Sequence, residues 1–165
     1  CVALTLQQLQ VNLSDIFIKN MYSPSIDLKP QNPKAFPDCE IDFAWFVARG
    51  FPQKSAIIIG ECKGQGPIKL NEFENDLRNL DQVASSLPHH RFDTFILIAK
   101  LTAFTADEIG LAKVLHQKHQ RKIILLTDRE LEPYNIYDRT RLAHKIDGQA
   151  RTPEHLANTT AQIYF

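Results

Sequence analysis

Three short apolar runs separated by helical patterns constrain the fold of this 165-residue chain more than any other feature. The runs lie at Ser55–Lys63, Phe92–Ala99 and Lys122–Thr127. Continuous aliphatic stretches of this length are typical of strands that are covered on both faces. Between them, apolar residues at three- and four-residue steps predict a helix over Leu70–Leu87 and another from Thr105 to about His119. Successive strand–helix–strand units predict parallel neighbouring strands.

The segment before these runs predicts an antiparallel partner. Residues of Glu40–Ala48 alternate between the two faces, as in a strand, and the turn Arg49-Gly50-Phe51-Pro52 joins them to Ser55–Lys63. Further upstream, the pattern predicts a helix over Thr5–Lys19 and then a proline-rich loop over Tyr22–Pro37, with one short edge strand at Ile26–Leu28. We therefore expect one α/β domain over residues 1–165, in which an antiparallel hairpin feeds a parallel sheet with helices on both faces.

Two further signals mark helix starts. Thr105 and Glu108 have the spacing of a capping box, and Thr152-Pro153 is a typical opening of a last helix. After Thr127, where Thr127 and Glu130 have the spacing to cap a short turn, the other signals weaken.

Composition excludes several classes of protein. Apolar residues make up 44% and charged residues 23%, which is ordinary for a globular domain, and the formal net charge of zero argues against binding nucleic acid through bulk charge. The three cysteines form no C-x-x-C pair, so we expect neither a disulfide scaffold nor a zinc knuckle. Without a long apolar run or a leader sequence, the expected location is the cytoplasm, with no membrane partner. Because the first residue is Cys1 rather than Met, we expect a domain of a longer polypeptide.

A group of charged residues is predicted where the hairpin strands meet. Glu61 and Lys63 are two residues apart and share a face of their strand, while Cys62 points the other way. Asp42 shares a face with Glu40 on the partner strand, and pairing can bring Asp42 beside Glu61 and Lys63. Placing two ionised carboxylates at the end of an apolar strand costs free energy unless a cation compensates their charge. Magnesium prefers such oxygen ligands and leaves other positions to water and phosphate.

A lysine beside such a cation completes a plausible phosphodiesterase site. Lys63 can orient or deprotonate a water molecule or hold a phosphate, whereas it cannot bind the metal while it is charged. Metal, water and phosphate at one point are the components of phosphodiester hydrolysis. The alternative is a cross-strand salt bridge between Glu61 and Lys63 with Asp42 solvated.

Asp42 followed by Glu61-Cys62-Lys63, after an apolar strand and before a helix, resembles the PD-(D/E)xK nucleases, the restriction-endonuclease-like superfamily. The resemblance covers about Leu6 to Thr127. It implies that Asp42 and Glu61 bind a metal ion, that the Cys62 carbonyl is a further ligand, and that Lys63 is the catalytic lysine. The stretch Leu125–Arg139 also resembles nuclease domains of bacterial restriction or anti-phage defence systems.

The family pattern is incomplete here. Many members carry a glutamate on the first helix, but only Asp15 is acidic between Cys1 and Asn20, which leaves a second metal in question. A polar residue on the helix after the lysine is also common. Candidates for this and other supporting roles are Glu40, Asn75, Asn79 and Gln82, and candidates for nucleic-acid contact are Gly64, Gln65, His90 and Arg91. A solvated loop is the alternative for His90 and Arg91.

The sequence thus predicts a Mg²⁺-dependent nuclease, with Mn²⁺ able to substitute and with DNA preferred over RNA as substrate. The alternative is an inactive module of the same fold that binds nucleic acid or a protein. Because a neutral domain has little general attraction for nucleic acid, we expect a homodimer or a fused recognition or sensor domain.

Overall fold

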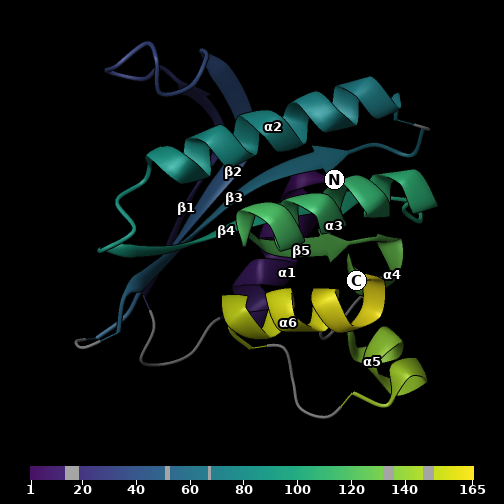
Figure 1. The fold of residues 1–165 in the computed structure, drawn as a ribbon. Coiled ribbons are helices and arrows are strands. Elements are labelled where there is room, and N and C mark those ends of the chain that lie inside the picture. The colour runs from purple at the N-terminus through teal and green to yellow at the C-terminus, as the bar shows by residue number, and fades with distance from the viewer. Residues whose placement is uncertain (14–18, 51–52, 67, 132–135, 147–150) are drawn as a thin grey trace.

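The computed structural model describes residues 1–13, 19–50, 53–66, 68–131, 136–146 and 151–165. Five strands form one mixed sheet in the order β1-β2-β3-β4-β5 (Figure 1). The strands are β1 (Lys19–Leu28), β2 (Cys39–Ala48), β3 (Ser55–Lys63), β4 (Phe92–Lys100) and β5 (Lys122–Leu126). The helices are α1 (Val2–Asn12), α2 (Leu70–Ser86), α3 (Ala106–His119), α4 (Asp128–Leu131), α5 (Asp138–His144) and α6 (Pro153–Tyr164).

The strand directions confirm the predicted mixed sheet. β1, β2 and β3 are antiparallel neighbours, whereas β3, β4 and β5 run parallel. The connections β3–α2–β4 and β4–α3–β5 are the two predicted strand–helix–strand units. Parallel pairing aligns Lys63 with Lys100, so the carboxyl ends of β3 and β4 lie at the same edge of the sheet. This edge is where α/β proteins most often place their binding sites.

Helices cover both faces of the sheet, as the continuous apolar strands require. On one face, side chains from α1 and α6 pack against Trp45 and Phe95, which have no exposed surface. On the other face, α2 and α3 lie together and pack against Ile59 and Ile96 (Figure 1). Because β3 and β4 are buried on both sides, polar side chains at their ends can be tolerated only where partners are supplied.

The first strand corrects two expectations. We predicted a helix over Thr5–Lys19, but α1 begins at Val2 and ends at Asn12. We also predicted a loop over Tyr22–Pro37 with a short edge strand at Ile26–Leu28, and that edge strand is the end of the ten-residue strand Lys19–Leu28. Residues 14–18 of the expected helix lie outside the described residues. Among the described residues, β1 pairs with β2 alone and is mostly exposed, so it has no need of alternating apolar residues. Pro24 is compatible with this position because an edge strand can leave one donor unused.

The predicted helix starts are present. The Thr105 hydroxyl accepts a hydrogen bond from the Glu108 amide at 3.3 Å, and the Glu108 carboxylate accepts one from the Thr105 amide at 2.7 Å. The Thr152 hydroxyl caps α6, which begins at Pro153. The expected cap at Thr127 also forms, because the Glu130 carboxylate accepts from the Thr127 amide at 2.7 Å. The seven-residue helix α5 was not predicted.

Side chains satisfy the outer edge of β5. The Leu125 amide donates to the Thr160 hydroxyl at 3.1 Å, and the Leu125 carbonyl accepts from the Tyr137 hydroxyl at 2.6 Å. Tyr137 and Thr160 have no exposed surface. These bonds, with α6 alongside the strand, close an edge that would otherwise be a template for pairing with another chain.

None of the helices in the described part of the chain is both long enough and apolar enough to cross a membrane.

Candidate active site

The pairing of β2 with β3 places Asp42 against the backbone of the Glu61-Cys62-Lys63 segment. Phe43 is opposite Gly60, and Asp42, the residue before Phe43, accepts a hydrogen bond from the Cys62 amide through its Oδ2 at 2.6 Å. This bond holds the carboxylate of Asp42 between the positions from which Glu61 and Lys63 leave β3. Asp42 and Glu61 therefore lie near enough for the charge of Asp42 to act on Glu61, and Lys63 contacts Glu61 on the same strand.

A glycine makes this close pairing possible. A Cβ at position 60 would lie 2.3 Å from the Cζ atom of Phe43, well inside van der Waals contact. The ring of Phe43 occupies that space and is fully buried. Glycine at 60 thus lets the strands approach one residue before Glu61.

Lys63 joins the two strands to helix α2. Its Nζ atom lies 3.3 Å from Oε2 of Glu61 and 2.6 Å from Oδ2 of Asp76, so the closer partner is the helical aspartate. Burial is the largest influence on the pKa of Lys63 and lowers it, but the hydrogen bond to Asp76 and the charges of Glu61 and Asp76 together outweigh burial. The pKa of Lys63 is therefore raised, and the lysine is a stable cation.

For Glu61 the raised pKa disfavours the charged form, whereas for Lys63 it favours the charged form. The side chain of Glu61 is 14% exposed, and burial raises its pKa to about 7. The charge of Lys63 lowers this pKa, whereas the charges of Asp42 and Asp76 raise it. One ammonium group therefore does not compensate three carboxylates, and a second cation at this point would stabilise the ionised form of Glu61.

The oxygen donors fit a magnesium ion better than a soft metal. The hydrogen bonds described for Asp42 and Glu61 use one oxygen of each carboxylate, Oδ2 and Oε2. Mg²⁺ binds through one or two carboxylates and completes its coordination with water and phosphate oxygens. Within the described ranges, no group of three or more His, Cys, Asp or Glu side chains is arranged to hold a metal ion, so the protein side chains at this point supply at most two such ligands.

Cys62 points away from this group, as its place in the strand predicts. Its Sγ lies 3.5 Å from the hydroxyl of Thr5 on α1, on the opposite face of the sheet. Burial raises the pKa of the thiol to about 11, so it is un-ionised at neutral pH. The side chain of Cys62 thus does not face the carboxylates. Its main chain does, because the Cys62 amide donates a hydrogen bond to Asp42.

Helix α2 contributes Asp76 rather than the residues that the sequence singled out. Because α2 runs back toward the start of β4, Asn79 and Gln82 lie about one and two turns further from Lys63. Asn75 accepts from Arg78 on the exposed side of the helix. Asp76 was missed, although it follows Phe73 by three residues and therefore borders the buried face of α2. An acid on that border is a readable signal.

The other predicted residues fall into two groups. Gly64 and Gln65 follow Lys63 directly and are exposed at the same edge of the sheet. His90 and Arg91 precede β4, whose first residue aligns with Ser55, so roughly 26 Å of strand separates them from Lys63. Glu40 is exposed and accepts a hydrogen bond from Ser25 at 3.0 Å. The structure does not bring His90 or Arg91 to Lys63.

Comparisons with known proteins do not assign a family. No protein family model and no curated protein matches the sequence. Among solved structures, the chain is similar to the MspJI restriction endonuclease in complex with a 27-mer oligonucleotide, with a TM-score of 0.38 and 15% sequence identity. The similarity covers 88% of this chain and 28% of that chain, so this chain spans less than a third of that protein's length.

Proposed function

We propose that this chain is a metal-dependent nuclease domain that hydrolyses phosphodiester bonds, with DNA preferred over RNA. The observation that carries the proposal is the meeting of Asp42, Glu61 and Lys63 at the end of the β2–β3 hairpin. This arrangement supports the resemblance to the PD-(D/E)xK nucleases. Two carboxylates and an amine at the carboxyl edge of a parallel sheet can serve one phosphate group and one divalent cation.

Asp42 and Glu61, with the Cys62 carbonyl, would hold Mg²⁺ or Mn²⁺. When bound, the ion supplies charge neutralisation at the phosphate and lowers the pKa of water. Ionised Glu61 is the form that binds a cation, and its pKa near 7 in the metal-free chain means that binding displaces a proton at neutral pH.

Lys63 acts as a cation in this proposal. Because its pKa is raised, the proton stays on Nζ, and the ammonium can stabilise negative charge on a phosphate oxygen instead of accepting a proton. Asp76 is a positioning residue, because its 2.6 Å contact fixes the direction of the Lys63 side chain. Exposed Gly64 and Gln65 lie where a substrate backbone can approach the lysine.

Cleavage assays test the proposal. Plasmid DNA and a labelled RNA of the same sequence are incubated with the protein and Mg²⁺ or Mn²⁺. We expect cleavage that EDTA abolishes, and at least a hundredfold loss of rate in Asp42→Ala, Glu61→Ala and Lys63→Ala. The matched control is Glu74→Ala, which removes an exposed carboxylate from α2. Unchanged rates in all three site variants would disprove the assignment of the site.

The second candidate function is an inactive binding module of the same fold. The observation that favours it is that Lys63 already has two carboxylate partners, so these residues can serve as a structural ion pair. This candidate predicts a gel shift with DNA, or capture of a protein, but no cleavage with either metal. It also predicts that Lys63→Met lowers the free energy of unfolding, because Glu61 and Asp76 lose their shared cation.

A further inference from the structure

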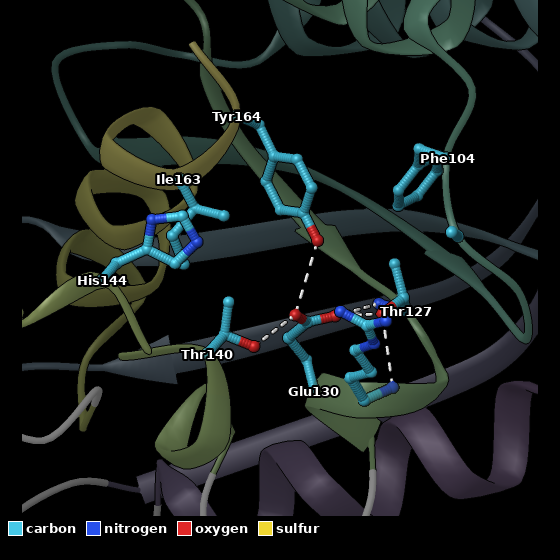
Figure 2. A pocket seen from close by; sticks show the side chains of 9 residues that line it. Phe104, Thr127, Glu130, Thr140, His144, Ile163 and Tyr164 are labelled. Atoms are coloured by element: carbon cyan, nitrogen blue, oxygen red, sulfur yellow. Dashed lines mark hydrogen bonds between the residues drawn. The ribbon is translucent and has the colours of Figure 1, made fainter. Parts of the chain in front are cut away.

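A cavity of about 260 Å³ lies beyond the carboxyl ends of β4 and β5, between α4, α5 and α6 (Figure 2). Its volume is slightly below the roughly 300–1,000 Å³ of most small-molecule pockets, so a ligand larger than one ring system would extend through the opening. The residues that define its chemistry are Phe104, Arg129, Glu130, Thr140, His144 and Tyr164. None of them belongs to the Asp42–Glu61–Lys63 site.

A buried carboxylate forms the polar part of the cavity. Glu130 is 1% exposed, and its Oε2 atom accepts from both the amide and the hydroxyl of Thr127. Its Oε1 atom accepts from the Thr140 hydroxyl at 2.8 Å and from the Tyr164 hydroxyl at 3.4 Å. The last bond is long and therefore weak, so a ligand N–H group can replace it at little cost.

The walls of the cavity are aromatic and apolar. The rings of Phe104 and Tyr164 meet edge to face, with centroids 6.3 Å apart and an interplanar angle of 83°. Figure 2 shows Tyr164 pointing toward Glu130 and Phe104 on the neighbouring wall. A flat ring that packs against these walls gains aromatic contact while its edge reaches the carboxylate.

An arginine and a histidine side chain lie at the opening. Arg129 and His144 line the cavity and are exposed. The guanidinium of Arg129 has no salt bridge within the described residues, so its charge is available to an anion. An anion without a hydrogen-bond donor would not bind the Glu130 carboxylate, and an apolar ligand would interact with neither Glu130 nor Arg129. The combination favours a molecule with a flat donor-bearing ring and an anionic group.

We propose that this cavity binds one nucleotide, with the base against Tyr164 and Phe104 and the phosphate near Arg129 and His144. An amino group of the base donates to Oε1 of Glu130, as carboxylates do when they read amino-bearing bases. Stacking on aromatic side chains and a cationic contact to phosphate are the usual elements of nucleotide recognition. The nucleotide is either free or part of a single strand.

Calorimetric titration of the 165-residue chain in EDTA tests the proposal with AMP, CMP, GMP and UMP. We expect saturable binding of one or more of the three amino-bearing nucleotides, and binding of UMP at least about tenfold weaker than CMP, because UMP presents a carbonyl where CMP has its amino group. Arg129→Gln should weaken nucleotide binding about tenfold through the lost charged contact. Tyr164→Leu should weaken it similarly, whereas Tyr164→Phe should retain it because the ring remains.

Controls separate this site from the nuclease site. Lys118→Gln removes one exposed positive charge on α3 and should not change nucleotide affinity, and neither should Glu61→Ala. A single-stranded octanucleotide distinguishes a free nucleotide from one within a strand. If the strand inserts a base into the cavity, Arg129→Gln should bind the octanucleotide more weakly. If only free nucleotides enter, Arg129→Gln should bind the octanucleotide as the wild type does and the free nucleotide more weakly. No saturable binding of any nucleotide, equal binding of all four, or full binding by both Arg129→Gln and Tyr164→Leu would overturn the proposal.

Discussion

Glu61 and Lys63 show how the same degree of enclosure acts differently on an acid and a base. Both side chains lie at the carboxyl end of β3 and are less than a quarter exposed. Lys63 has carboxylates on two sides, so its charge is compensated, whereas Glu61 shares one ammonium with two other acids. The ionisation of Glu61 therefore depends on what else is bound at the site.

The first prediction concerns the pH dependence of stability in the metal-free protein. The pKa of Glu61 rises from 4.5 in the unfolded chain to about 7 in the fold. Between these values the folded state binds more protons, so the contribution of Glu61 to the free energy of unfolding is full below pH 4.5 and is lost as the pH rises through 7. The loss is on the order of 2–3 kcal/mol.

Urea unfolding in EDTA at pH 5 and pH 8 measures this effect, with Glu61→Gln as the variant. We expect the wild type to lose more stability between the two pH values than Glu61→Gln does. Glu74→Gln, an exposed change on α2, should behave like the wild type. An identical pH dependence in the wild type and Glu61→Gln would show that burial does not affect this carboxyl group.

The second prediction concerns the contact between Gly60 and Phe43. Gly60→Ala should reduce the free energy of unfolding by about 1–3 kcal/mol, because the added methyl group would overlap the Phe43 ring. Phe43→Leu removes that ring and should make the alanine tolerable. In urea unfolding, the double variant should therefore be more stable than the sum of the two single effects predicts. Strict additivity would mean that the two positions do not compete for the same space.

At the scale of elements, the sequence predicted best those parts that are buried on both sides. The run at Ser55–Lys63 is β3 with the expected bounds, because a strand that is buried on both faces needs a continuous run of apolar residues. β1 was not predicted at full length because its pairing with β2 is what makes it a strand. Its mostly exposed residues show no alternation of apolar and polar positions. Helical spacing places Asp76 on the border of the buried face of α2, but it does not show that Asp76 reaches Lys63 on the neighbouring strand.

The third prediction concerns the closed edge of β5. Tyr137→Phe removes the donor for the Leu125 carbonyl and a partner of Thr160, and leaves both groups buried. We expect a loss of about 1–3 kcal/mol in the free energy of unfolding. Tyr22→Phe is the control, because Tyr22 is 51% exposed and its ring, not its hydroxyl group, contacts Trp45. Equal stability of the two variants would mean that the edge bonds contribute little.

At the scale of the whole molecule, the candidate site links the two halves of the sheet. Asp42 belongs to the antiparallel half, Glu61 and Lys63 belong to the strand that both halves share, and Asp76 comes from the helix that leads into the parallel half. A cation that binds Asp42 and Glu61 therefore stabilises the fold as a unit and not one local segment.

The fourth prediction follows from this linkage. Saturating Mn²⁺, at about 100 times its dissociation constant, should add about 2.7 kcal/mol to the stability of the wild type. For a chain of this size that is a rise of roughly 5–10 °C in the melting temperature. Differential scanning calorimetry should show the rise in the wild type and in Glu74→Ala, but not in Asp42→Ala. Equal rises in all three proteins would place the ion elsewhere.

The common direction of β3, β4 and β5 also gives the molecule an end suited to attachment. Near the start of β3, the Nζ atom of Lys54 donates to the carbonyl of His89, which ties the turn before β3 to the loop before β4. Gln53, exposed beside Lys54, is separated from Lys63 by roughly 26 Å of strand or more. A fluorophore or a tether to a glass surface at Gln53 would therefore lie at the opposite end of β3 from the carboxylate cluster and leave that cluster facing solution.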